Sequence, residues 1–152
     1  MLAVIWFDAT RYLIPNWLVG SLLIIYPLAV YDMGHGAVDW KMALVGMAVV
    51  FAVGYFVFAM KWMGGGDIKL LAVCALWVGW RNLPEFMAYV TLLGGALSIV
   101  VLVLRKALPY VPWIAGQTLP RILRDHEPVP YGLAIAAGFL LMAAGGKIPA
   151  MP

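Results

Sequence analysis

The chain has 152 residues, of which 65% are apolar and 11% charged, and its net charge at neutral pH is +3. Soluble domains are about 45–50% apolar and about 25% charged, so this composition excludes an ordinary soluble domain and indicates an integral membrane protein. The length suits a single membrane-embedded domain over residues 1–152, and because the basic residues form no stripe interleaved with aromatic residues, nucleic acid is not expected as a partner.

The N-terminal part of the chain predicts a short stub and two membrane spans. Residues 1–7 are apolar but fall well below the about 20 residues that a helix needs to cross a bilayer. Residues 15–31 are the first plausible span, in which Pro27 favours a kink. Residues 32–41 carry two acids, a histidine and two glycines and are predicted to form an exposed loop. Residues 42–60, uncharged throughout, are the clearest span.

The second half predicts three further apolar segments, residues 68–80, 85–104 and 129–145. Residues 81–84 are predicted to form a turn, and Gly94, Gly95 and Ser98 give the following span a small-residue face for close helix packing. Residues 105–128 alternate charged and apolar side chains between prolines and predict a loop on the membrane surface. The expected fold class is therefore all-α, a polytopic helical bundle with about five membrane segments plus the N-terminal stub.

The distribution of basic residues predicts how the chain is oriented. If Asp67 faces the cytoplasm, the alternation of spans places seven basic residues on that side: Arg11, Lys61, Lys69, Arg105, Lys106, Arg121 and Arg124. The opposite side then holds three: Lys41, Arg81 and Lys147. The positive-inside rule favours this orientation. The same alternation places Asp8 on the cytoplasmic side, so two acids that are distant in sequence share one membrane face.

These two acids are the strongest candidates for chemistry. Asp67 directly follows the glycines at 64–66, and Asp8 stands ahead of residues 14–16 (Ile-Pro-Asn). Ionisable residues at the edge of a bilayer are functional candidates by default. Two carboxyl groups that meet across helices hold one proton between them near neutral pH. One can then take a proton from water while the other protonates the carbonyl oxygen of a peptide bond.

Other side chains near the two acids have supporting or alternative roles. The glycines before Asp67 would let a substrate backbone approach closely, and Lys69 could bias the sharing of the proton or extend to lipid headgroups. Asp67 could instead be only a helix N-cap, and Asp8 only a solvated helix end. The run Asp125-His126-Glu127 has metal-ligand residue types, but a solvated loop is the favoured interpretation. No metal or cofactor is expected.

The remaining special residue types favour structural roles. The lone cysteine, Cys74, lies in an apolar run and is expected to pack inside a helix, since it has no partner for a disulfide or a cysteine-based zinc site. The tryptophans fall mostly near the predicted span ends, which is typical of an interfacial belt; they are Trp6, Trp17, Trp40, Trp62, Trp77, Trp80 and Trp113.

The chain resembles the type IV prepilin peptidases, aspartic membrane proteases that carry a Gly-x-Gly-Asp motif. The resemblance rests on Asp8 with Arg11 and residues 14–16, on residues 64–71 (GGGDIKLL), and on residues 130–135 (PYGLAI) ahead of the last span. It covers residues 8 to about 140. Members of the family have a complete membrane helix ahead of the first Asp, whereas seven residues precede Asp8 here.

The resemblance implies an endopeptidase of the bacterial inner membrane that cleaves the leader from prepilin-like subunits at the cytoplasmic face. By the same resemblance Asp8 and Asp67 are the catalytic pair, supported by Gly64, Gly66, Lys69 and Asn16. Longer members add a cytoplasmic domain, often with a cysteine-bound zinc, and methylate the new N-terminus. This sequence has no such Cys-x-x-Cys pairs and looks like the short form that serves Flp-type (tight-adherence) pili. We therefore expect Flp-type prepilins as substrates, and peptidase without methyltransferase activity.

Two alternatives from other functional classes stay open at this point. The chain could be a non-enzymatic membrane component of a pilus or secretion assembly system, with the acids used for helix packing and partner contacts. It could also be a transporter fragment in which Asp8 and Asp67 relay protons at broken helices. Catalysis requires both acids and requires them to meet, a structural role tolerates Asp→Asn at either position, and a relay needs a polar path across the membrane.

Overall fold

A computed structural model describes residues 1–11, 13–32, 38–107 and 129–149. The described residues form helices and no strand, which confirms the all-α prediction: α1 (Leu2–Arg11), α2 (Asn16–Asp32), α3 (Trp40–Ala59), α4 (Gly65–Ala107) and α5 (Tyr131–Ala144). The surface loop expected at residues 105–128, with its Asp125-His126-Glu127 run, lies beyond residue 107 outside the described residues, as do residues 33–37 of the loop expected at residues 32–41.

The bundle has the outer surface of a membrane protein. Within the described ranges, α3 and α4 are long and apolar enough to cross a bilayer, and α2 and α5 are shorter apolar helices. Large apolar side chains on α3 and α4 point outward, among them Phe56 and Leu92, each 70% exposed. Such an apolar outer surface would be costly in water, and it suits contact with lipid.

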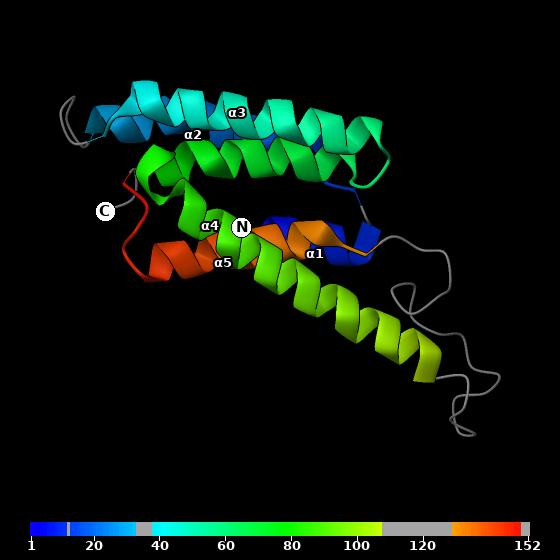
Figure 1. The fold of residues 1–152 in the computed structure, drawn as a ribbon. Helices are drawn as coiled ribbons and strands as arrows, with labels where there is room; N and C mark the ends of the chain where they lie inside the picture. The colour runs from blue at the N-terminus through cyan, green and yellow to red at the C-terminus, as the bar shows by residue number, and fades with distance from the viewer. Residues whose placement is uncertain (12, 33–37, 108–128, 150–152) are drawn as a thin grey trace.

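The long helix α4 is broken at Gly79 and folds back on itself (Figure 1). Gly79 has φ 75° and ψ 163°, a backbone conformation that is open almost exclusively to glycine. The turn predicted at residues 81–84 is therefore wrong, because these residues are helical and the chain reverses just before them. Pro84 lies at the beginning of the second turn of the second arm, where it removes one hydrogen bond to the carbonyl oxygen of Trp80. We call residues 65–78 the first arm of α4 and residues 80–107 the second arm.

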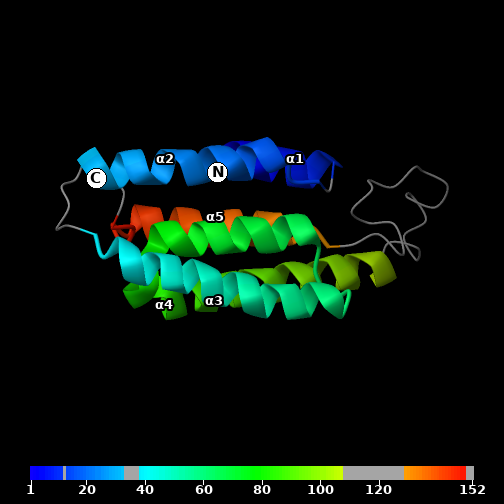
Figure 2. The same ribbon diagram turned by 90° about the horizontal axis from the view of Figure 1, so that it is seen from above.

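The first arm of α4 is the centre of the bundle. Its residues from Leu70 to Val78 are all buried, Cys74 among them, and α2, α3 and α5 all contact α4. Figure 2 shows the first arm lying among its neighbours when the bundle is seen from above. A helix that is apolar on every side is stable only when it is enclosed in this way. The segment that seemed short for a membrane span is thus an internal helix.

Trp77 corrects the expectation that the tryptophans mark the membrane interface. It is buried on the first arm of α4, where its ring packs edge-on against Tyr26 of α2 at 5.5 Å between ring centroids. Its indole nitrogen donates a hydrogen bond to the carbonyl oxygen of Leu22, 3.1 Å away. A tryptophan whose one polar atom is satisfied can be buried without penalty, so Trp77 joins α2 to the central helix.

Close helix packing depends on glycines at two crossings. A Cβ at Gly54 of α3 would lie 2.6 Å from Ile68 Cγ2 of α4, and a Cβ at Gly94 would lie 3.1 Å from Tyr131 Cε1 of α5. Gly94 therefore packs as the small-residue face predicts. Its neighbour Gly95 does not, because a Cβ there would meet no atom within 4 Å.

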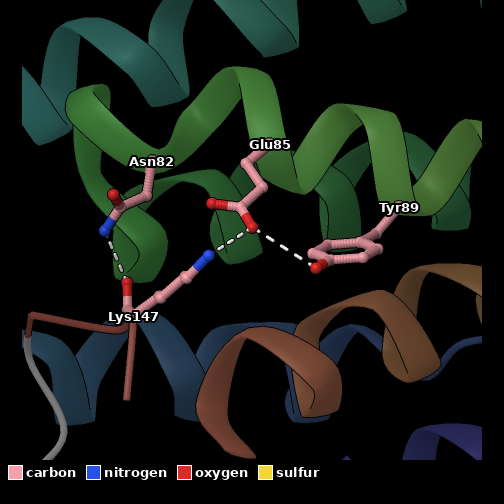
Figure 3. A network of polar contacts seen from close by, with 4 residues as sticks. All are labelled: Asn82, Glu85, Tyr89 and Lys147. Carbon is pink, nitrogen blue, oxygen red and sulfur yellow. Dashed lines mark hydrogen bonds and ion pairs between the residues drawn. The ribbon is translucent and has the colours of Figure 1, made fainter. Parts of the chain in front are cut away.

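A polar network ties the chain after α5 to the second arm of α4 (Figure 3). Lys147 Nζ lies 2.5 Å from Glu85 Oε1, and the Tyr89 hydroxyl donates to the same oxygen at 3.3 Å. Asn82 Nδ2 donates to the Lys147 carbonyl oxygen at 2.6 Å. The hydrogen bond to Glu85 raises the pKa of Lys147, so the ammonium is charged at neutral pH. The network lies close to Gly79 in the chain, at the end of the bundle where α4 turns back.

Candidate active site

A pocket of about 400 Å³ lies at the end of the bundle away from Gly79, where α1 ends and where α4 and α5 begin (Figure 1). Both candidate acids, Asp8 and Asp67, line it. The four residues expected to support them line it too: Asn16, Gly64, Gly66 and Lys69. The sequence-predicted site residues are thus brought together in one cavity from α1, α2 and α4.

Asp67 is positioned by the glycine turn at the start of α4. The N–H of Ile68 bonds the carbonyl oxygen of Gly64 at 3.3 Å, so Gly64 occupies the cap position and Asp67 is the third residue of the helix. The Asp67 carboxylate lies beside this cap residue, since a Cβ at Gly64 would be 3.2 Å from Asp67 Oδ2. Asp67 is therefore not the N-cap that was considered as an alternative. It reaches back to the cap residue like the acid of a capping box, which fixes its carboxylate at the pocket.

Asp8 is held by the N-terminus of α5. Its side chain is buried, at 3% exposed, and Oδ2 accepts a hydrogen bond from the N–H of Leu133 at 2.8 Å. Pro130, the residue at the cap position of α5, makes no side-chain cap of its own. Asp8 therefore caps α5 from another helix, where the partial positive charge of the helix end stabilises a carboxylate. A solvated helix end, the alternative considered for Asp8, does not fit a side chain held in this way.

Gly132 packs directly against Asp8. It lies between Leu133, whose N–H bonds Asp8, and Tyr131, which lines the pocket with Asp8 and Asp67. A Cβ at position 132 would lie 2.7 Å from Asp8 Oδ2 and 2.9 Å from Ile14 Cδ1. Side chains other than hydrogen therefore do not fit, and glycine is required here by the close approach of α1 to α5.

The geometry of the pair supports acid–base chemistry. Two carboxyl groups that line one pocket repel each other when both are ionised, so the arrangement favours a proton shared between them. The N-termini of α4 and α5 both face the pair and favour one negative charge there. The pocket is open to the outside, so water and a peptide segment can reach the acids. The arrangement has both partners that a metal-independent hydrolysis needs, one base and one acid.

The supporting residues lie around the pair at different depths. Gly66 faces Ile14, whose Cβ would be 3.5 Å from a Cβ at position 66. Lys69 is exposed, and its ammonium donates a hydrogen bond to Asn16 Oδ1 at 3.2 Å, which joins α2 to α4 at the rim of the pocket. The Ile-Pro-Asn element thus contributes its isoleucine to the wall beside the glycine turn and its asparagine to the rim.

Sequence reasoning assigned no role to Tyr131, Gly132 or Leu133. Residues 130–135 entered only through the resemblance, although they provide the N–H groups that hold Asp8 and a further wall of the pocket. The hydrogen bond from Leu133 to Asp8 joins residues 125 positions apart. The local signal that could have been used is the glycine two residues after Pro130, at the start of an apolar helix.

The chain is similar in sequence to a known protein family and to several of its curated members. The model of the Type IV leader peptidase family matches residues 1–99. The chain is 32% identical over 157 residues to the prepilin leader peptidase/N-methyltransferase of Pseudomonas aeruginosa, covering 97% of this chain and 48% of that protein. It is 32% identical over 159 residues to the protein of the same name from Stutzerimonas stutzeri, covering 99% and 48%. For that of Escherichia coli the identity is 28% over 119 residues, covering 71% and 52%.

The chain spans about half the length of these curated relatives. No solved structure matches it. Because the family model matches well over half of the residues, including both acids and the glycine turn, the chain belongs to the Type IV leader peptidase family.

Proposed function

We propose that the protein is an aspartic endopeptidase that removes the leader from prepilin-like subunits, with Asp8 and Asp67 as the catalytic pair. The observation that carries the proposal is that both carboxylates line one open pocket, with Asp8 held by the N–H of Leu133 and Asp67 placed by the glycine turn. Family membership supports the same reaction, since the relatives are prepilin leader peptidases by name.

The proposed reaction uses the pair as base and acid. The ionised carboxylate takes a proton from a water molecule, which attacks the carbonyl carbon of the scissile peptide bond. The protonated carboxyl gives its proton to the carbonyl oxygen, and a tetrahedral intermediate forms without a covalent link to the enzyme. Collapse of the intermediate breaks the C–N bond, and the leaving amine takes a proton from the pair. The glycines at 64 and 66 leave the approach to Asp67 open for the substrate backbone.

Three finer points of the proposal concern where the enzyme acts, which substrate it cleaves and whether it also transfers a methyl group. We propose that the enzyme acts in the bacterial inner membrane and at its cytoplasmic face, which the seven-to-three distribution of basic residues supports. We propose Flp-type prepilins as substrates and cleavage without methyl transfer. The last point rests on the resemblance to the short form that serves Flp-type pili. Mass spectrometry of the processed pilin would contradict it by finding a methylated N-terminus.

The test separates catalysis from helix capping at the same residue. In Asp8→Asn the amide oxygen can still accept the N–H of Leu133, so the protein should fold and insert normally while cleavage falls by about 10²–10⁴-fold or more. In Asp8→Ala the cap is lost as well, which should also destabilise the protein by about 1–2 kcal/mol. Asp67→Asn should likewise fold and insert normally and should lose cleavage to a similar extent.

The assay measures cleavage of an Flp-type prepilin in membranes per molecule of inserted enzyme. Near-normal cleavage by either Asn variant would refute the assignment and favour a structural role for the acids. Normal cleavage with loss of proton flux across vesicles would favour the relay. A reporter fused after Lys106 should be cytoplasmic and one after Lys147 external, and the reverse would place both acids on the wrong face.

A further inference from the structure

A second, apolar cavity adjoins the pocket of the two acids. It is a groove of about 550 Å³ between α3 and the second arm of α4. Two of its lining residues, Met63 and Tyr131, also line the pocket that contains Asp8 and Asp67. Tyr131 directly precedes Gly132, which packs against Asp8. The apolar groove and the acidic pocket therefore lie next to each other and meet at Met63 and Tyr131.

The chemistry of the groove favours an apolar occupant. Valines and methionines make up most of its lining, and its few polar atoms have partners within the protein. The Thr91 hydroxyl donates to the carbonyl oxygen of Met87 at 2.8 Å, and the Tyr131 hydroxyl lies 3.2 Å from Ser98 Oγ. The groove runs between α3 and α4, the two membrane-length helices, so it lies at the depth of the bilayer. An entering chain would find few hydrogen-bonding groups there and must bring apolar side chains.

Another apolar groove, of about 580 Å³, lies between α2, α3 and the first arm of α4. It also borders the pocket, but through Asn16 and Lys69, which are hydrogen-bonded to each other at 3.2 Å. This bond crosses the junction and places a charged ammonium where an apolar segment would have to pass. Displacing it would cost the desolvation of a charge, so the groove at α2 is the less suitable path to the acids.

We infer that the groove between α3 and the second arm of α4 holds an apolar, membrane-inserted segment of the protein substrate, so that a peptide bond next to that segment reaches Asp8 and Asp67. The inference rests on the proposed peptidase function. Gly95 leaves part of the groove open, because a Cβ there would meet nothing within 4 Å. Met63 and Tyr131 form the boundary that the substrate crosses between its apolar and its cleaved part.

Two glycines give a matched test of the inference. Gly95 lines the proposed groove and Gly20 lines the groove at α2, both lie within helices, and a Cβ at either would meet no atom within 4 Å. Gly95→Leu should fill the proposed groove and lower kcat/KM for an Flp-type prepilin by about tenfold or more. Gly20→Leu should change it by no more than about twofold. Equal effects of the two substitutions, or normal cleavage by Gly95→Leu, would overturn the inference.

Photo-cross-linking tests occupancy without requiring cleavage. A benzophenone amino acid would replace Val53, which lines the proposed groove, or Phe51, which lines the other, each in Asp67→Asn protein in lipid vesicles with the prepilin precursor. Position 53 should cross-link to the precursor and position 51 should not. Cross-links from position 53 to lipid alone, or to a second copy of the enzyme, would overturn the inference. Cross-linking at position 53 by a protein whose wild-type form never cleaves the precursor would instead refute the peptidase proposal and leave the groove standing.

Discussion

Replacement of Gly132 by alanine tests whether the contact between α1 and α5 sets the geometry of the catalytic pair. The added methyl carbon would lie 2.7 Å from Asp8 Oδ2, 2.8 Å from Asp8 Cγ and 2.9 Å from Ile14 Cδ1. Non-bonded carbon atoms prefer separations of about 3.5–4.0 Å, so Asp8 and α5 must move apart by about 1 Å. The backbone of α5 cannot give way alone, because its N-terminus is bonded to Asp8 through Leu133.

The expected loss has a structural and a catalytic part. Overpacking in a tight core lowers the free energy of unfolding by about 1–3 kcal/mol. A hydrogen bond to a charged group contributes about 1.5–3 kcal/mol, so weakening it lowers the stability further, by no more than that amount. A displacement of about 1 Å at a catalytic group lowers the rate by about 10²-fold. Gly132→Ala should therefore remain able to insert, melt at a lower temperature than the wild type, and lose about 10²-fold in kcat.

The assay combines thermal unfolding in detergent with prepilin cleavage per folded molecule. Gly20→Ala is the matched control, because a Cβ at Gly20 meets no atom within 4 Å and the substitution lies inside a helix. It should keep full activity and gain about 0.5–1 kcal/mol of stability. If Gly132→Ala retained wild-type kcat and melting temperature, the close approach of α1 to α5 would not exist as described, and the argument for Gly132 would be refuted.

Two further substitutions probe the two ends of the bundle. Gly66→Ala should keep near-normal cleavage, because its Cβ would lie 3.5 Å from Ile14 Cβ. Gly66→Val should press against Ile14, shift the start of α4 and lower cleavage per inserted molecule by about tenfold or more. Equal activities of the two variants would show that the turn is only a connector. Lys147→Ala removes an ion pair whose side chains are 44% and 38% exposed, so the melting temperature should change little and cleavage should stay the same. Pairing raises the pKa of Lys147, so the contribution of the pair is present at neutral pH and is lost as the pH rises through that pKa. A large fall in the melting temperature at neutral pH would contradict this prediction.

Local patterns in the sequence predicted the apolar helices from α2 to α5 and singled out the two acids that line the pocket, but not the helix α1 that carries Asp8. A carboxylate after three glycines at the start of an apolar run, and the absence of charge from residues 42 to 60, both reflect interactions between near neighbours in the chain. The break in α4 was predicted a few residues late, because Pro84 is the stronger local signal for a turn than Gly79. Only the backbone shows that Gly79 adopts the conformation at which the chain reverses.

What could not be predicted depends on contacts between distant segments. Trp77 is of a residue type typical of the membrane interface. It can be buried because the carbonyl oxygen of Leu22 in α2 accepts a hydrogen bond from its indole N–H. Gly132 resembles any helix-start glycine until Asp8 is placed beside it. A single sequence does not show which side of an apolar helix meets which neighbour, and both of these residues depend on that choice.

The second arm of α4 is a long helix that starts at the reversal at Gly79, so a small rotation there moves its far end considerably. With about 1.5 Å of rise per residue, residues 80–107 extend for about 42 Å, so a rotation of about 5° at the reversal displaces the far end of the arm by about 4 Å. Glu85 and Lys147 hold the arm close to Gly79, and the groove lining on the arm runs from Leu83 to Gly95. Farther along, Ser98 Oγ donates a hydrogen bond to the Tyr131 hydroxyl at 3.2 Å, so the arm is held against α5 a second time and loss of Lys147 alone leaves the opening beside the acids in place.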